Sequence, residues 1–314
     1  MKTVFAPGKA ILAGEYAVLH GGPAIAVAVD RGARAWLEHG QGTAPSPFVV
    51  AALDKAAKEL NAPHLLQSGH LGVDSSGLYE GTKKIGLGSS AAVTAAALGA
   101  AFVAEGRSLD DKQKLFALAD DAHAIAQGTR GSGIDVAVAV YGGAIKFQRK
   151  NGEVSIEQVE LPDGVRLTFV FTGQSASTPM LLGKVKALAE SQPARHEAAI
   201  GRLLSQAHAF CAAVAHGEAR ELIAAADAYR EAMQFLGDAA GAEIVTREHA
   251  QLAMLARRHG GTAKPSGAGG GDLGVAFTVG ADATHALREE CRAAGLNVLS
   301  LGAPAPGLRM EMES

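Results

Sequence analysis

The spacing of apolar residues along the 314-residue chain predicts a protein that mixes helices and strands. Alternating apolar positions over residues 23–37 predict a β-strand pair or hairpin. Further strands are predicted over residues 165–171, 274–279 and 297–301. The alanine-rich stretch 89–105 predicts a largely buried helix. Additional helices are predicted over residues 109–127, 178–189, 193–215, 217–236, 240–259 and 282–294.

Turn-forming residues divide this pattern into two halves. Asn151-Gly152 is typical of a β-hairpin turn. Pro162-Asp163-Gly164 is the strongest candidate for a domain boundary. We therefore expect an N-terminal domain over residues 1–163 and a C-terminal domain over residues 164–314. Residues 38–47 are rich in Gly, Gln and Pro, which predicts a surface loop.

Composition and charge exclude several classes of protein. Apolar residues make up 48% of the chain and charged residues 19%, which is typical of a soluble globular protein. The formal net charge of −3 offers no general basic field for nucleic acid. We expect no signal peptide and no apolar stretch of membrane-spanning length, so the expected location is cytoplasmic, without a membrane partner. Cys211 and Cys291 are expected to be buried apolar residues.

The chemically most informative segment is the run IGLGSSAA at residues 85–92, which opens the alanine-rich helix. Glycines allow a tight turn and a close approach of the backbone to a ligand. The first turn of a helix leaves N–H groups unpaired, and its dipole favours anions. The run therefore predicts a phosphate-binding cradle, to which Ser89 and Ser90 add hydroxyl groups. The chain has no GxxxxGK[ST] sequence, so this is not a Walker-type P-loop.

Two further segments extend this interpretation. One is APGKAILAGEYAV over residues 6–18, and the other is KPSGAGGGD over residues 264–272. Together with the run at 85–92, they resemble the three motifs of the GHMP small-molecule kinases, in the family's order and with roughly its spacing. The resemblance spans the chain from Pro7 to Asp272.

This resemblance implies an α+β protein with the two-domain GHMP kinase fold, in which an S5-like N-terminal domain precedes a ferredoxin-like C-terminal domain. It also implies phosphoryl transfer from ATP with Mg²⁺. Asp135 would accept or orient the acceptor's proton, and Lys9 would stabilise negative charge on the transferring group. The residues expected to bind the ATP phosphates are Gly86, Leu87, Gly88, Ser89, Ser90 and Ala91, with Ser89 and Ser90 also as metal ligands. The residues expected around the acceptor are Glu15, Tyr16, Arg130, Ser132, Ser175, Ser177, Ser266, Gly267, Ala268, Gly269 and Gly270.

Local details favour phosphomevalonate kinases within the family. Residues 126–136, AQGTRGSGIDV, are similar to the AQGKxGSGFDV stretch of eukaryote-type phosphomevalonate kinases, with Arg130 and Ile134 in place of Lys and Phe. Ala124 stands where mevalonate kinases carry a Mg²⁺-binding glutamate. The sequence SASTP over residues 175–179 also resembles the phosphomevalonate group. The resemblance thus implies phosphorylation of 5-phosphomevalonate to 5-diphosphomevalonate in the mevalonate pathway of isoprenoid synthesis.

Some alternatives stay open at this level. The sequence GGPAIA over residues 21–26 is closer to mevalonate kinases, so mevalonate or another unphosphorylated hydroxy compound is the competing acceptor. A non-catalytic GHMP-like binding protein is disfavoured because both Lys9 and Asp135 are present. Arg130 is the preferred ligand for an acceptor phosphate, because its planar fork matches phosphate geometry. We expect a small-molecule substrate, no nucleic acid, and either a monomer or a homodimer. The sequence leaves the role of Asp272 open.

Overall fold

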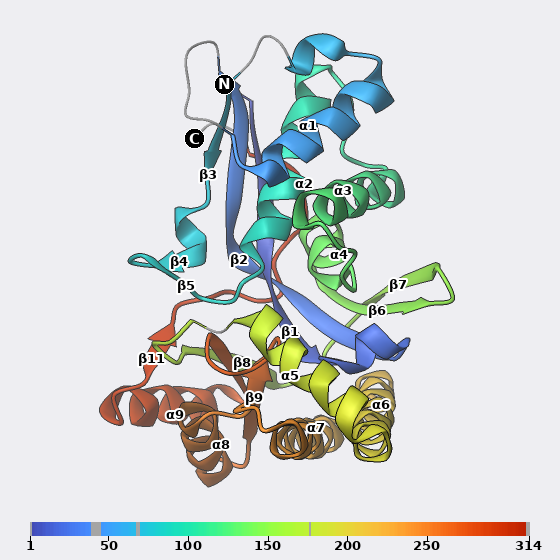
Figure 1. The fold of residues 1–314 in the computed structure, drawn as a ribbon. Coiled ribbons are helices and arrows are strands. Elements are labelled where there is room, and N and C mark those ends of the chain that lie inside the picture. The colour runs from blue at the N-terminus through green and yellow to red at the C-terminus, as the bar shows by residue number, and fades with distance from the viewer. Residues whose placement is uncertain (1, 39–44, 67–69, 176, 312–314) are drawn as a thin grey trace.

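Figure 1 shows the computed structural model, which describes residues 2–38, 45–66, 70–175 and 177–311. Two antiparallel sheets form its framework. The larger sheet contains, in spatial order, β12 (Arg309–Glu311), β1 (Thr3–Ala13), β2 (Pro23–Glu38), β6 (Ala144–Lys150) and β7 (Glu153–Val159), with β3 (His70–Asp74) also paired to β2. The smaller sheet contains β11 (Asn297–Leu299), β8 (Val165–Phe171), β10 (Leu273–Val279) and β9 (Thr262–Ser266). A separate short hairpin consists of β4 (Tyr79–Glu80) and β5 (Lys83–Lys84).

Helices of the first half gather on one side of the larger sheet (Figure 1). They are α1 (Pro47–Leu60), α2 (Ser89–Ala104), α3 (Lys112–Gln127) and α4 (Ile134–Tyr141). Helices α2 and α4 pack directly on β1 and β2, and α1 and α3 pack on α2. Twelve of the 16 residues of α2 are buried and seven of these are alanine, which lets its backbone lie close to the sheet. The start of α2 is therefore held firmly beside β1.

Helices of the second half surround the smaller sheet (Figure 1). They are α5 (Thr178–Ser191), α6 (Pro193–His216), α7 (Ala219–Ala240), α8 (Arg247–Arg258) and α9 (Ala281–Ala293). Helices α7, α8 and α9 pack on the sheet, while α6 packs on α7 and reaches β2. Short 3₁₀ helices occupy Ala17–His20, Pro63–Leu66 and Ser76–Leu78.

Several predicted elements need correction. Residues 23–38 form one long strand, so the predicted strand pair or hairpin is wrong. The break in the alternation is a bulge, because the register between β1 and β2 shifts between Pro7 and Gly8. Helix α8 begins only at Arg247, after the N-cap Thr246. Helix α1 was not predicted, and most of the predicted loop over 38–47 lies outside the described residues.

Helix α6 bears on the expectation that the chain has no membrane-spanning stretch. Its 24 residues reach a mean hydropathy of 1.2 within one window, which is enough by length and composition to cross a membrane. A core helix of a soluble protein passes the same test, and 39% of this window is buried. Its buried residues include Leu203, Ala207 and Phe210, and the Phe210 ring packs edge-on against Phe277 of β10. By length and composition alone, α6 therefore contradicts the expectation that no apolar stretch is long enough to span a membrane.

The two halves of the chain are joined at more than one place. Strand β12, near the end of the chain, pairs with β1 through Thr3 and Glu311. Strands β1 and β9, which belong to different sheets, also contact each other. The division at residues 163 and 164 stays a prediction, and the last strand lies in the sheet of the first half.

Candidate active site

Two cavities meet between the halves of the chain. The first has a volume of about 470 Å³ and is lined by the start of α2, the β4–β5 hairpin and residues 266–269. The second has a volume of about 230 Å³ and is lined by residues from the 3₁₀ helix Ala17–His20, α3 and the start of α4. The residues that line both cavities are Lys9, Asp135, Thr178, Gly267 and Ala268. A group bound in one cavity would therefore meet a group bound in the other beside Lys9 and Asp135.

The first cavity contains the N-terminus of α2. Its N-cap, Gly88, has a φ of +73°, and a Cβ there would lie 3.1 Å from Cγ of Lys9 and 3.3 Å from Oδ2 of Asp135. Glycine is therefore required both for the left-handed backbone and for the close approach of these two side chains. The unpaired N–H groups of the first turn lie next to Ser89 and Ser90, as expected of an anion site.

Lys9 and Asp135 form an ion pair where the cavities meet. Lys9 Nζ lies 3.6 Å from Oδ2 of Asp135, and their side chains are 8% and 36% exposed. The backbone N–H of Lys9 donates to the carbonyl of Leu87 at 3.0 Å, which fixes β1 beside the glycine turn. Asp135 lies in the first turn of α4, and the N-cap of that helix is Gly133. The carboxylate is thus not the helix cap, and the α4 dipole favours its charge.

Ser90 has a partner on α3. Its Oγ lies 3.0 Å from Nε2 of His123, and the His123 ring lies 5.2 Å from the ring of Phe48. Burial lowers the pKa of His123, although the nearby Asp135 and Asp120 act in the opposite direction. The imidazole therefore orients the Ser90 hydroxyl at the helix start.

Residues 266–269 form the wall opposite α2. Gly269 has a φ of +79°, and a Cβ there would lie 2.2 Å from the carbonyl oxygen of Ile244, so only glycine fits. Ser266 Oγ accepts a hydrogen bond from the N–H of Ile11 at 2.8 Å. Tyr16 donates its hydroxyl to the carbonyl of Ala268 at 2.6 Å, and burial raises the pKa of Tyr16. This wall is thereby tied to the first motif.

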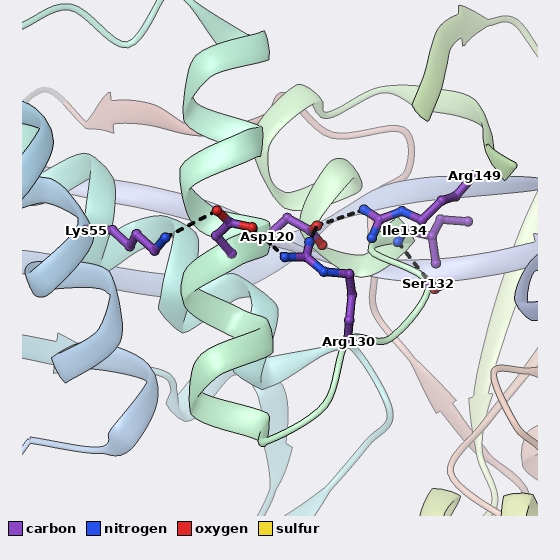
Figure 2. Close-up of polar contacts among 7 residues, drawn as sticks. Lys55, Asp120, Arg130, Ser132, Ile134 and Arg149 are labelled. Atoms are coloured by element: carbon purple, nitrogen blue, oxygen red, sulfur yellow. Dashed lines mark hydrogen bonds and ion pairs between the residues drawn. The ribbon is translucent and has the colours of Figure 1, made fainter. Parts of the chain in front are cut away.

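Arg130 lines neither cavity, and it belongs to an ion-pair network that includes Asp120 of the second cavity (Figure 2). Its two terminal nitrogens each donate at 2.5 Å, one to Oδ2 of Asp120 and one to Oδ1 of Asp121. Asp120 also accepts from Arg149 at 2.7 Å, and Asp121 accepts from Lys55 at 3.2 Å. Hydrogen bonding to Arg130 is the main cause that lowers the pKa of Asp121. The guanidinium therefore ties the loop before α4 to α3.

The structure brings most of the predicted site residues together. Those that line the first cavity alone are Gly86, Leu87, Gly88, Ser89, Ser90, Ser175, Ser266 and Gly269. Those that line the second alone are Glu15, Tyr16 and Ser132. Four predicted residues line neither cavity: Ala91, Arg130, Ser177 and Gly270. Ala91 is buried in α2, and Ser177 caps α5 by accepting from the N–H of Met180.

Other cavity residues were not predicted. Thr178 lines both cavities, and His123 and Asp120 line the second. Thr178 stands within the SASTP segment, which was the available signal, whereas no local pattern singles out Asp120. Across the described ranges, no group of three or more His, Cys, Asp and Glu side chains could hold a metal ion.

Comparison with known proteins places this geometry in a family. Residues 47–143 match the model of the GHMP kinases N-terminal domain. The chain is 29% identical to a phosphomevalonate kinase from Streptomyces sp. strain CL190, over 96% of this chain and 97% of that enzyme. The chain thus contains a GHMP kinase N-terminal domain. It is 27% identical to a mevalonate kinase from Thermococcus onnurineus, over 85% of this chain and 86% of that enzyme.

Solved structures agree with this chain in fold. A Streptococcus pneumoniae phosphomevalonate kinase in complex with phosphomevalonate and AMPPNP superimposes with a TM-score of 0.83 at 21% identity, covering 96% of this chain and 100% of that chain. The predicted α+β, two-domain GHMP kinase fold is confirmed. The chain is thus an ATP-dependent phosphotransferase that acts on a small molecule.

Proposed function

We propose that this GHMP kinase transfers the γ-phosphoryl group of ATP to 5-phosphomevalonate, giving 5-diphosphomevalonate and ADP. The observation that carries the reaction is the Lys9–Asp135 pair at the junction of the two cavities. The acceptor is supported by the similarity to the Streptomyces phosphomevalonate kinase along nearly the whole chain. An oxygen of the acceptor phosphate attacks the γ-phosphorus, and the bond between that phosphorus and the bridging oxygen of ADP breaks.

The ATP phosphates fit the first cavity. The N–H groups at the start of α2 and the side chains of Lys83 and Lys84 line it and offer positive charge. Mg²⁺ is usually held by one or two protein oxygens together with substrate phosphates, and the hydroxyls of Ser89 and Ser90 suit that donor set. Bound there, the ion would neutralise charge on the β- and γ-phosphates. Ser89 and Ser90 are accordingly the proposed metal ligands.

A phosphorylated acceptor changes what Asp135 has to do. The second pKa of a phosphate monoester is about 6, so its oxygens have lost their protons above neutral pH. No general base is then required, and the carboxylate serves to orient Lys9. The ammonium of Lys9, largely shielded from water, reduces the repulsion between the γ-phosphoryl group and the acceptor phosphate.

The position of Arg130 affects its proposed role. The acceptor phosphate has to reach Lys9, because the new bond forms there, and Arg130 lines neither cavity. Its two terminal nitrogens are already paired with Asp120 and Asp121. We therefore propose that Arg130 supports the wall of the second cavity rather than binding the acceptor phosphate.

A coupled ADP-release assay tests the proposal, with phosphomevalonate, mevalonate and galactose as acceptors. We expect kcat/KM for phosphomevalonate to exceed that for mevalonate by at least about tenfold, a difference of about 1.4 kcal/mol. Equal or faster turnover of mevalonate would instead support the second candidate, a mevalonate kinase, which the Thermococcus similarity favours. The family assignment would stand in either case.

A further inference from the structure

Lys264 is a buried charged residue that has no role in the reaction proposed above. It lies in β9 with none of its surface exposed, and it lines neither cavity. Its ammonium group pairs with Oε1 of Glu15 and donates to the carbonyls of Pro265 at 2.6 Å and Ile11 at 3.5 Å. Burial lowers the pKa of Lys264, while Glu15 acts in the opposite direction. Lysine is almost never fully buried unless it is paired, so the ion pair with Glu15 accounts for the burial of Lys264.

The partner, Glu15, faces the second cavity. Its side chain is 2% exposed, and its Oε1 also accepts a hydrogen bond from the N–H of Gly267 at 3.3 Å. Its Oε2 is buried and has no hydrogen-bond partner among the described residues. A buried carboxylate oxygen without a partner is costly. Oε1 makes the contacts of this carboxylate with Lys264 and with the N–H of Gly267, so these two groups hold it in place.

The same pair joins two motifs that are distant in sequence. The Ser266–Ile11 and Tyr16–Ala268 hydrogen bonds flank it, and Tyr229 donates its hydroxyl to the carbonyl of Glu15 at 2.8 Å. Lys9 lies two residues before Ile11. A Cβ on Gly267 would lie 3.8 Å from Nζ of Lys9. The Lys264–Glu15 pair therefore lies among the contacts that fix the distance between Lys9 and residues 266–269.

We propose that Lys264 is a positioning residue for phosphoryl transfer, acting through Glu15. Through the Glu15 carboxylate, which accepts from the N–H of Gly267, it holds residues 266–268 at their distance from Lys9. The identity of the second cavity as the acceptor site rests on the proposed function. The alternative is that Lys264 only stabilises the fold.

Steady-state kinetics of Lys264→Met distinguish these roles, with melting temperature (Tm) and ATP affinity measured alongside. All rates are taken well below the Tm of each variant. The acceptor in these assays is the one that the wild-type kinase uses best. A wrong assignment of phosphomevalonate as the acceptor then leaves the test of Lys264 intact. We expect kcat/KM for the acceptor to fall by about 10²-fold, the usual effect of a displacement of about 1 Å near the reacting groups. The Kd for ATP should change by less than about threefold, because we propose that the phosphates bind mainly at the N-terminus of α2, and Lys264 lies on β9.

A control variant that loosens the hold on the same strand is Asp227→Asn, on α7. Asp227 accepts hydrogen bonds from Thr262 of β9 at 2.7 Å and from Arg257 at 2.7 and 2.9 Å, and it lines neither cavity. It should lower Tm and leave kcat/KM unchanged. If Lys264→Met does not fold, Lys264→Arg keeps the charge but displaces Glu15, and the same loss is expected. A kcat/KM within about threefold of wild type in the variant that folds would overturn the positioning role.

The double variant Lys264→Met/Glu15→Gln provides a second readout. Removing one member of a buried pair leaves an uncompensated charge, whereas replacing both by neutral groups of similar size restores stability. We expect the double variant to recover Tm but to keep the low kcat/KM. Recovery of both quantities together would show a purely structural role and overturn the proposal.

Discussion

Separate replacement of Lys9 and Asp135 tests which kind of oxygen attacks ATP. Only 8% of the Lys9 side chain is exposed, whereas 36% of the Asp135 side chain is exposed. The ammonium therefore acts on phosphoryl charge with little screening by water, while the carboxylate is more open to solvent. We expect Lys9→Met to remove most of the rate and Asp135→Asn to remove much less.

The expected magnitudes follow from these surroundings. Removing one donor that stabilises transition-state charge in a water-poor site costs about 10²–10³ in kcat, or about 2.7–4 kcal/mol, and Lys9→Met should fall in that range. A positioned general base contributes about 10²–10⁴ when a hydroxyl has to lose its proton. A phosphate acceptor needs no such base, so Asp135→Asn should cost less than about tenfold, which is below about 1.4 kcal/mol.

The measurement is steady-state ADP release at saturating ATP. The concentration of phosphomevalonate is varied at each pH between about 5.5 and 8.5. Protonation of the acceptor phosphate should lower the rate below about pH 6, and this decline should persist in Asp135→Asn. Calorimetric ATP binding serves as the control and should be similar in both variants. A loss of 10²-fold or more in Asp135→Asn, together with disappearance of the decline at low pH, would refute the reasoning and identify Asp135 as a general base.

Three further predictions concern Arg130, the start of α2 and a buried histidine. Arg130→Met should raise KM for phosphomevalonate by less than about tenfold, whereas a charge-assisted phosphate contact would give about 10–150-fold; a rise in that range with unchanged kcat would restore Arg130 as a phosphate ligand. Ser89→Ala/Ser90→Ala should weaken Mg·ATP binding in calorimetry without lowering Tm strongly, because both hydroxyls line the first cavity; unchanged binding would place the phosphates elsewhere. Burial lowers the pKa of His249 to about 4, so the unfolded chain, with a histidine pKa of about 6.5, binds more protons between these values and stability falls as pH falls through them, by about 3 kcal/mol in total. Denaturant unfolding of His249→Gln should show a flatter pH dependence over that window, and an equally steep one would contradict this cause.

Much of the local structure could be predicted from sequence. The glycine-serine run placed the start of α2 correctly, because a turn and a helix N-terminus depend on neighbouring residues. The Asn151-Gly152 turn between β6 and β7 was correct for the same reason, with Asn151 at a φ of +54°. The prediction over 23–37 was wrong, because a bulge and a turn interrupt the apolar alternation in the same way.

The sequence by itself determined the family, the fold class and the segments that carry the site, since each depends on residue types at short and regular spacing. Only the tertiary structure decided which charges neutralise one another. Arg130 is paired on α3 rather than turned toward a cavity, and Lys264 meets Glu15 from 249 positions away. Partner choice among charged side chains depends on burial and on distance between packed elements. No local pattern contains that information.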